Sequence, residues 1–491
     1  MTDLRSKQMS SHQATQAQPA ATGRFAGFLE ENGLLVIVLG AFAIVLVVAL
    51  RKDLVVDGWM ALVSGRWIVQ HGLPSHDALT VWAHGHRWID QQWLAQLGFY
   101  GLWRLGGVKL ALLVHALLVT SGLAGAALFA RSRGASARSV TWIAIPVLIA
   151  YYPVASVLRP QSFAFPLFAA VLWLALADAR QPSRRVFWTL PLLALWTNLH
   201  GSVVLGAALV SLDGIVAMVQ QRRASGRGLA LVLAPWACVF ASPYGPHMPS
   251  YYEKILVGGD FKHFVTEWAP TTLSAQTAAV YLIVLGGLWM LGRAGRETPL
   301  LDQLAFAFAS ILAFEAVRNT AWIGLVALAV LPPLVDRLRN PAEEPARLNR
   351  ILSVTIFATL VIATAGVAAK STGWFTSNFP TAAASATSAA AGPHGRVFAS
   401  SPFADWLLWS RPELTGRVAY DARFELFSAE QLQRIARFQG RAGDWLKTAR
   451  GFGVFVLDPR KDHALEQSLL RDLPARVAFS SQQVVVLRRR G

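Results

Sequence analysis

The chain carries eleven apolar runs, separated by polar turns, between residues 33 and 369. A helix that crosses a bilayer needs about 17–25 mostly apolar residues, because the hydrocarbon core offers no water to the backbone. The mean hydropathy is +0.41, and only 15% of the residues are charged, against about 25% in soluble domains. The sequence therefore predicts a mainly α polytopic membrane protein with about eleven transmembrane helices. They are expected at residues 33–50, 108–130, 140–158, 162–177, 186–198, 202–219, 229–241, 277–291, 300–314, 320–335 and 351–369.

Arginine is concentrated in alternate turns between these runs. The turns at 131–138, 180–185, 222–227, 293–296 and 337–350 each hold two or more arginines. Because cytoplasmic loops are enriched in Lys and Arg, these turns are predicted to face the cytoplasm, together with the N-terminus. The basic residues, which give a formal charge of +17, lie in short clusters between apolar runs. We therefore exclude nucleic acid as a partner and predict the lipid bilayer instead.

Composition divides the chain into four parts. Residues 1–32 are polar and predict a disordered cytoplasmic arm. Residues 33–370 form the membrane domain, with a first outer loop at 51–106. Residues 371–392 are rich in Ala, Ser and Thr and predict a linker. Residues 393–491 alternate short strand and helix patterns, which predict a small extracytoplasmic α/β domain.

Polar side chains gather in the turns that this topology places outside. Ionisable groups at membrane depth are costly and usually line a cavity or pair with one another. Trp59, Trp67, Trp88 and Trp93 recur on an amphipathic pattern, which predicts helices along the membrane surface. Because the outer turns share one leaflet, we expect a single pocket that opens to that side. Its candidates are Asp57, Asp77, His84, His86, Asp90, Arg159, Gln161, Asn198, His200, Glu267, Trp268 and Arg318.

The runs DGWMALVSGRWIVQHGLPSHDALT and GHRWIDQQWL resemble the first outer loop of bacterial GT-C-like glycosyltransferases. RPQ, LLALWTNLHGSVVLG, SPYG and EWAP are similar to later landmarks of that group, and VAYDARFELFS resembles a motif in its exported domain. The resemblance begins at about residue 57 and follows the same order. It implies a GT-C-like fold in the bacterial inner membrane and a sugar donor linked to polyprenyl phosphate.

The resemblance also implies an acidic residue close after the first span, the place that Asp57 occupies. The acceptor hydroxyl must lose a proton as it attacks the sugar, and a carboxylate can accept that proton. Asp57 is the candidate base, although an aspartate there also suits a helix N-cap. Asp77 and Asp90 are further catalytic candidates. Their alternatives are closing a turn for Asp77 and capping a helix for Asp90.

The leaving phosphate needs cationic or hydrogen-bonding groups. Arg159 is the first candidate, since arginine matches phosphate oxygens with two parallel hydrogen bonds. Its alternative is snorkelling to the interface, and Arg318 competes for the same role. His86 shares a loop with His84, and the pair suits phosphate or a metal, although no metal-ligand spacing recurs.

Four other turn residues are candidates for binding sugar. Asn198 and His200 suit hydrogen bonds to sugar hydroxyls, or the tying of two helices. Glu267 and Trp268 suit hydrogen bonding and stacking on a sugar, or the capping of a helix. Gln161, which follows Arg159 by two residues, is placed in the same substrate-binding group.

The sequence therefore predicts a glycosyltransferase that moves a hexose or pentose from a polyprenyl-phosphate-linked donor to an extracytoplasmic glycolipid, polysaccharide or protein. The chain has no P-loop, dinucleotide fingerprint or zinc-protease helix. A transporter or flippase of a lipid-linked or anionic solute is the alternative, and a non-catalytic scaffold is the third. Metal ligands are unassigned, and a divalent cation such as Mg²⁺ or Mn²⁺ is left open as a cofactor.

Overall fold

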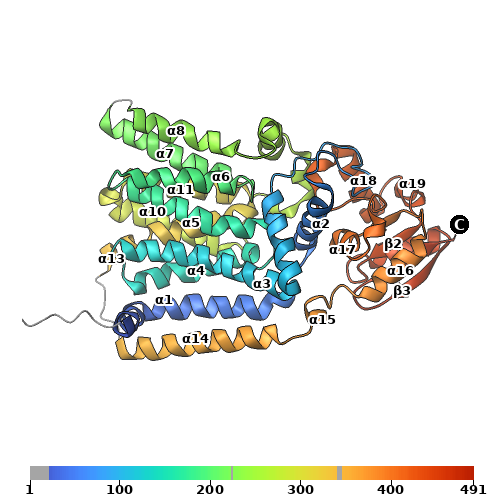
Figure 1. Cartoon of the computed structure of the whole chain (residues 1–491), viewed down its shortest axis with the longest axis horizontal. Coiled ribbons are helices and arrows are strands. Elements are labelled where there is room, and N and C mark those ends of the chain that lie inside the picture. Colours follow the sequence, from blue (N-terminus) through green and yellow to red (C-terminus); the bar gives the residue numbers. More distant parts are fainter. Residues whose placement is uncertain (1–20, 53, 223–224, 340–345, 491) are drawn as a thin grey trace, which may run out of the picture.

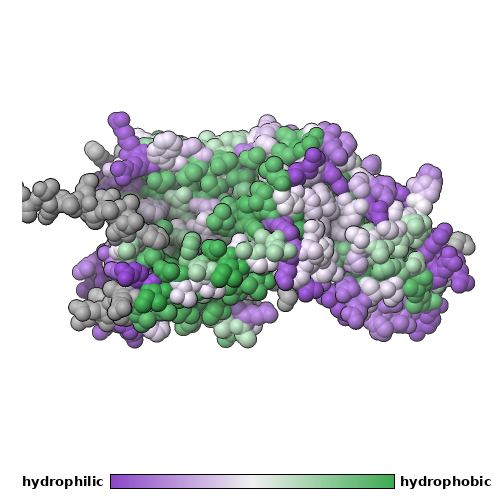
Figure 2. Space-filling model, turned by 60° about the horizontal axis from the view of Figure 1, so that its bottom comes forward, coloured by the Kyte–Doolittle hydropathy of each residue, from purple (hydrophilic) through white to green (hydrophobic). Residues whose placement is uncertain are grey.

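The computed structural model describes residues 21–52, 54–222, 225–339 and 346–490. They form a bundle of long helices and a smaller α/β domain at one end of it (Figure 1). Hydrophobic residues cover much of the flank of the bundle, while hydrophilic residues dominate the far end of the α/β domain (Figure 2). The bundle comprises α1 (Ala21–Ala49), α3 (Trp93–Ser132), α4 (Ala137–Ala155), α5 (Ala164–Asp178), α6 (Thr189–Trp196), α7 (Val203–Gln221), α8 (Gly226–Val239), α10 (Ala278–Ala294), α11 (Leu300–Glu315), α12 (Thr320–Val330), α13 (Pro332–Leu338) and α14 (Ala346–Ala368).

Each of the eleven predicted spans overlaps one or two of these helices, in the predicted order. Seven helices of the described ranges are long and apolar enough to cross a membrane, or eight if α12 and α13, which meet at 47°, are one broken span. The shorter helices are α6, α8 and α11. The predicted mainly α membrane fold with a small α/β domain is confirmed, and the number of crossings stays a prediction.

The predicted N-terminal arm is shorter than expected. Residues 1–20 lie outside the described part of the chain, but α1 already begins at Ala21. Six of the twelve residues from 21 to 32 are Ala, Leu, Glu or Arg. Several of these are good helix formers, so the helix extends beyond the apolar run that marks the span.

Ion pairs join the arginine-rich turns at the end of the bundle away from the α/β domain. Arg133, after α3, and Arg180, after α5, both pair with Asp302 near the start of α11. Asp302 is fully buried. Arg227, at the start of α8, pairs with Asp178 at the end of α5. Three of the five turns predicted to face the cytoplasm, at 131–138, 180–185 and 222–227, therefore lie together at one end.

The region predicted as the first outer loop is largely helical. It contains α2 (Val56–His71) and the beginning of α3. α3 bends at Gly106 and Gly107, and Gly107 has a φ of 67°, which glycine adopts without strain. The predicted second span begins directly after this bend. The residues before it therefore belong to the junction with the α/β domain.

Tryptophans of this region are buried at that junction. Trp59 of α2 is only 2% exposed, and its ring contacts those of Trp103, Phe379 and Trp409. Trp88 is also 2% exposed. The prediction that these tryptophans mark helices on the membrane surface is therefore wrong for Trp59 and Trp88. Periodicity shows that one face is apolar, and here that face packs against protein instead of lipid.

The α/β domain is built on a four-stranded sheet of order β1-β2-β4-β3. β1 (Val397–Ala399) is parallel to β2 (Val454–Leu457), and β4 (Val485–Arg489) is antiparallel to both β2 and β3 (Ala475–Ser480). The domain's helices are α17 (Ser401–Ser410), α18 (Ala429–Gly440), α19 (Trp445–Arg450) and α20 (His463–Asp472).

The predicted linker at 371–392 is also structured. It contains the short α15 (Thr372–Phe375) and α16 (Thr381–Ala391), and α16 packs against β3 and β4. Ala383 and Ala384 are buried. Alanine has the highest helix propensity, so a small-residue run that resembles a flexible linker forms a helix once one face is covered.

The first outer loop extends the edge of this sheet. Val81 and Trp82 donate backbone hydrogen bonds to Val418 and Ala419, at 2.8 and 3.1 Å. Ala419 in turn donates to Val397 of β1 at 2.9 Å. The α/β domain is thus hydrogen-bonded, backbone to backbone, to a loop more than 300 residues earlier in the chain.

Candidate functional site

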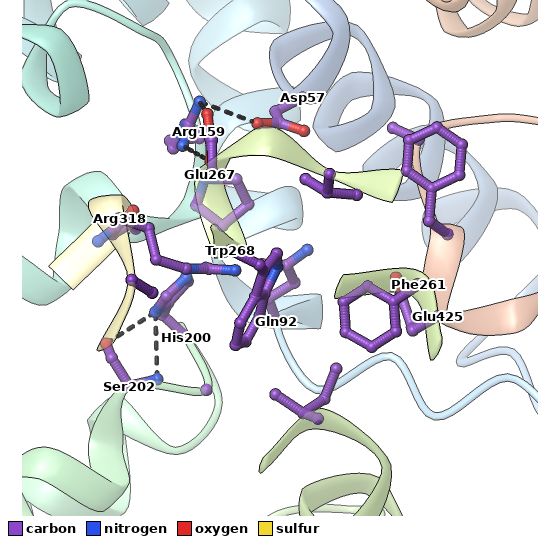
Figure 3. A pocket seen from close by; sticks show the side chains of 18 of the residues that line it. Asp57, Gln92, Arg159, His200, Ser202, Phe261, Glu267, Trp268, Arg318 and Glu425 are labelled. Atoms are coloured by element: carbon purple, nitrogen blue, oxygen red, sulfur yellow. Dashed lines mark hydrogen bonds and ion pairs between the residues drawn. The ribbon is translucent and has the colours of Figure 1, made fainter. Parts of the chain in front are cut away.

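A cavity of about 650 Å³ lies where the α/β domain meets the end of the bundle. Its walls come from the start of α2, from the turns before α5, α7 and α12, from the segment between α9 (Met248–Tyr252) and α10, and from the α/β domain. Figure 3 shows ten of its side chains by name. The cavity brings together seven of the predicted site residues, Asp57, Arg159, Gln161, His200, Glu267, Trp268 and Arg318.

Arg159 is the centre of an ion-pair cluster on one side of the cavity. Its two terminal nitrogens each lie 2.8 Å from an oxygen of Glu267, and one also lies 3.3 Å from Asp57 Oδ2. The Arg159 side chain is 11% exposed, whereas those of Asp57 and Glu267 are 43% and 41% exposed. The arginine therefore lies behind two carboxylates that face the cavity, and its own phosphate-binding edge is occupied.

The same cluster controls the ionisation of Glu267. Burial raises the pKa of Glu267, but its hydrogen bonds to Arg159 and the arginine charge outweigh burial and hold the pKa below its usual value. Glu267 is thus an anion at neutral pH. Asp57 contacts Arg159 through one oxygen only, which leaves the other oxygen for a ligand.

Arg318 is the better-placed cation for an anionic ligand. Its guanidinium stacks 4.3 Å from the centre of the Trp268 ring. Within the described part of the chain it makes no hydrogen bond and no ion pair. An arginine held over an aromatic face keeps its donors free, so Arg318 presents an unoccupied bidentate edge to the cavity.

His200 is held as a neutral hydrogen-bond donor. Its Nδ1 lies 3.2 Å from the Ser202 backbone nitrogen and accepts that N–H. Burial, with the nearby charges of Arg318 and Arg159, lowers the pKa of His200 to about 3. A neutral imidazole that accepts at Nδ1 carries its proton at Nε2. The ring therefore offers one N–H and no charge at physiological pH.

Asp77, predicted as a catalytic candidate, does not line the cavity. It accepts hydrogen bonds from the backbone nitrogens of Leu79 and Thr80 at 3.2 and 3.1 Å, which is the turn-closing role left open above. It also pairs with Arg423 of the α/β domain at 2.5 Å. Its side chain is fully buried, so it is a structural residue at the junction.

Asp90, the third catalytic candidate, is buried away from the cavity. It accepts a 2.8 Å hydrogen bond from Gln96, while its other oxygen has no hydrogen-bond partner among the described residues. Burial raises the pKa of Asp90 to about 7. Because its side chain is buried and does not line the cavity, Asp90 has no direct contact with a ligand there.

Asn198 and His86 also lie outside the cavity. The Asn198 amide donates to the backbone oxygens of Ala194 and Ala241 and accepts from Trp93, so it ties helices together, the alternative considered for it. His86 hydrogen-bonds Leu426 O at 2.9 Å. It lines a second, smaller hollow at the outer side of the junction.

The sequence did not single out several residues that the fold brings to the cavity. Tyr251, Lys262, Arg423 and Glu425 line it but are not among the site candidates. Glu425 lies in the run VAYDARFELFS, whose resemblance to an exported-domain motif was its only signal. No local pattern reports that this run folds back onto the membrane domain.

The residues present do not assemble an evident divalent-cation site. Among the described residues no group of three or more His, Cys, Asp or Glu side chains could hold a metal ion. Two of the cavity carboxylates, Asp57 and Glu267, both contact Arg159. A bound cation would have to compete with the arginine charge. We therefore derive no step through a metal.

Comparison with known proteins was made at the level of families, curated sequences and solved structures. No family model matches the chain. No curated protein matches it either. Among solved structures, ArnT from Cupriavidus metallidurans in the apo state aligns over 92% of this chain and 97% of its own, at 15% identity and a TM-score of 0.51. ArnT bound to undecaprenyl phosphate aligns over 95% and 98%, at 13% identity and the same TM-score.

The chain has the GT-C fold. The predicted GT-C-like architecture is thereby confirmed over nearly the whole length, including the α/β domain. In this fold the cavity lies at the junction of the two parts, and Asp57, near the start of α2, follows the first long helix by eight residues.

Proposed function

We propose that this protein is a membrane glycosyltransferase that transfers a sugar from a polyprenyl-phosphate-linked donor to an extracytoplasmic acceptor. The carrying observation is one cavity, at the end of a GT-C bundle, that combines accessible carboxylates with an arginine whose donors are free. ArnT, which shares the fold, has been solved with undecaprenyl phosphate. That ligand supports a lipid phosphate carrier for this chain as well.

In the proposed reaction the acceptor oxygen attacks the anomeric carbon of the donor sugar. The acceptor hydroxyl gives its proton to Asp57, and the bond between the anomeric carbon and the phosphate oxygen breaks, with both electrons staying on that oxygen. The products are the glycosylated acceptor and polyprenyl phosphate. Arg318 binds the phosphate and stabilises its growing negative charge.

Arg159 and Glu267 hold the base in place. The Arg159–Asp57 contact fixes the side chain of Asp57, and Glu267 takes up the other donors of Arg159. Without Glu267, Arg159 would bind Asp57 through both nitrogens and block the oxygen that must accept the proton. His200 Nε2 and Gln161 offer neutral hydrogen bonds that suit sugar hydroxyls.

We further propose the bacterial inner membrane as the location, with the N-terminus in the cytoplasm and the α/β domain in the periplasm. The arginine-rich turns lie at the bundle end opposite the α/β domain, and the positive-inside rule places that end in the cytoplasm. The cavity then opens to the side where envelope acceptors are found. The donor's lipid tail remains in the bilayer.

The test is made on the intact protein in lipid nanodiscs and in cells. Mass spectrometry of envelope glycolipids, polysaccharides and glycoproteins from a strain lacking the protein identifies the missing sugar, and the matching undecaprenyl-phosphate sugar is then supplied to the purified protein. We expect transfer by the wild type, and a loss of at least about 100-fold in D57N, the scale of a lost general base. D444N, an exposed acid of the α/β domain, serves as the matched control.

Two outcomes would contradict the proposal. Full turnover by D57N would remove Asp57 as the base. Movement of the labelled lipid-linked sugar across a vesicle membrane, with no glycosylated product, would identify a flippase instead.

A further inference from the structure

A second hollow of about 340 Å³ adjoins the cavity on its outer side. Phe261 lines both hollows. Glu425 lines the inner cavity, and the next residue, Leu426, lines the outer hollow. The polar residues of the outer hollow are His86, Lys254, Asp260 and Ser428. The two hollows therefore adjoin at Phe261, and a ligand longer than one sugar ring would extend from the inner cavity toward the outer hollow.

Glu425 lacks the ion-pair contacts that hold Asp57 and Glu267. Among the described residues its carboxylate makes no ion pair and no hydrogen bond to another side chain. It lies within η11 (Phe424–Leu426), directly after Arg423, whose hydrogen bonds to Asp77 and Asp421 fix this turn. In Figure 3 Glu425 and Phe261 lie on the side of the cavity away from Arg159.

Burial raises the pKa of Glu425, although the Arg423 charge opposes the rise. The half-buried carboxyl of Glu425 accepts a hydrogen bond from its own backbone N–H, but no other residue of the described chain satisfies its remaining acceptor positions. Hydroxyl groups of a ligand would supply the missing donors. The position beside an aromatic ring suits a pyranose, whose C–H face packs on the ring while its hydroxyls bond the carboxylate.

The surrounding charges select a neutral ligand. Lys262 of the inner cavity and Lys254 of the outer hollow oppose a cationic peptide. Glu425 and Asp260 oppose an anionic group. A hydroxyl-rich chain without net charge matches this mixture of donors and acceptors better than either.

The two sides of the cavity also differ in what can reach them. Arg318 and Trp268 lie on the bundle side, where a lipid phosphate arrives from the membrane. Glu425 belongs to the α/β domain and adjoins the outer hollow. We propose that Glu425 and Phe261 form the acceptor subsite, and that the acceptor is a neutral glycan of at least two sugars. This rests on the proposed glycosyltransferase function and names its acceptor class.

The experiment separates use of the donor from use of the acceptor. Purified protein in nanodiscs receives the undecaprenyl-phosphate sugar, and two products are measured. These are free sugar, formed when water replaces the acceptor, and label transferred to a glycan extract of the cell envelope. We expect E425Q to lower transfer about 10- to 100-fold, the range for a lost hydrogen bond to a charged group. Its donor hydrolysis should stay within about twofold of wild type.

Matched variants control for general damage. Glu430 is an exposed acid of α18 that lines neither hollow, so E430Q should transfer like the wild type. F261L should lower transfer and spare hydrolysis, while F264L, a change three residues away at a side chain outside both hollows, should not. Elution volume and melting temperature confirm that each variant is folded.

The acceptor class is tested on the same extract. Periodate, which cleaves vicinal diols, should abolish its acceptor activity, and protease should leave that activity intact. Loss of activity with protease, wild-type transfer by E425Q, or an equal fall of hydrolysis and transfer would each overturn the proposal. A wild-type protein that consumes no donor at all would instead refute the glycosyltransferase function on which the subsite depends.

Discussion

Replacing Arg423 with methionine should destabilise the contact between the α/β domain and the first outer loop. Arg423 lies 2.5 Å from Asp77 and about 3 Å, through Nε, from both oxygens of Asp421. The side chains of the two aspartates are fully buried, and that of Arg423 is 5% exposed. Methionine keeps most of the volume but leaves two buried carboxylates without a counter-charge.

The expected loss is about 3–5 kcal/mol of unfolding free energy at pH 7.5, the range for breaking a buried ion pair from one side. A smaller part, about 0.5–2 kcal/mol, comes from the Arg423–Trp88 contact, in which the guanidinium lies 4.0 Å from the ring centre. R423K keeps the charge but cannot bind both carboxylates as a planar fork. Its loss should therefore be the smaller of the two.

The pH dependence distinguishes the charges from simple packing. In the wild type burial raises the pKa of Asp77, but Arg423 outweighs it and holds the pKa below its usual value. The stability that Asp77 contributes is thus present above about pH 4 and lost as the pH falls through the folded pKa. In R423M, burial without the arginine charge would raise the pKa values of Asp77 and Asp421 above those of the unfolded chain. The folded protein would then hold protons that the unfolded chain releases. The loss of unfolding free energy in R423M, relative to the wild type, should therefore increase between about pH 4.5 and about pH 7.5.

Chemical denaturation in detergent, followed by tryptophan fluorescence, measures these differences at several pH values. The triple variant R423M/D77N/D421N removes the uncompensated charges and should regain most of the lost stability. An R423M protein as stable as wild type at pH 7.5, or a loss of unfolding free energy that does not depend on pH, would refute the role of the Arg423 ion pairs in holding the two parts together.

Three further variants test the site. R318M should weaken binding of undecaprenyl phosphate in nanodiscs about 10-fold or more, because charge-assisted hydrogen bonds are lost; unchanged affinity would exclude Arg318 from phosphate binding. D90N should raise the melting temperature at pH 7.5, and the gain should vanish toward pH 4. Burial raises the pKa of Asp90 to about 7, so above about pH 4 the ionisation of this carboxyl favours the unfolded chain. A gain that persists at pH 4 would contradict this. E267Q should cost about 1 kcal/mol at pH 7, since Glu267 is partly exposed. Because Arg159 holds the pKa of Glu267 below its usual value, that cost should disappear as the pH falls below about 4, which a pH series of melting curves checks.

The sequence carried enough information to assemble one side of the cavity. Asp57, Arg159, His200 and Arg318 follow or precede apolar spans, and alternating topology sends all such turns to the same end of a bundle. Their convergence is therefore a property of the span pattern. The pattern could not predict which arginine pairs with an acid. Glu267 pairs with Arg159, and Arg318 makes no ion pair among the described residues.

The remaining site depends on contacts that no local pattern encodes. Asp77 and Asp90 share with Asp57 an acidic side chain in a polar, tryptophan-rich loop, yet both are buried in the junction. Glu425 reaches the cavity only because residues 416–419 lie along the first outer loop. Pairing across more than 300 residues leaves no trace in periodicity, so the sequence could predict Asp57 and Glu267 as cavity residues but could place neither Asp77 and Asp90 in the junction nor Glu425 at the cavity.

The backbone pairing of Val81 with Val418 also orders events during synthesis. Residues 79–82 leave the ribosome long before their partners at 416–419 exist, so the early segment stays unpaired while the helices from α3 to α14 are synthesised. The cavity stays open on one side until residues 401–425 of the α/β domain have been translated and have folded. The walls of the cavity are thus completed in the order of synthesis, those of the bundle before those of the α/β domain.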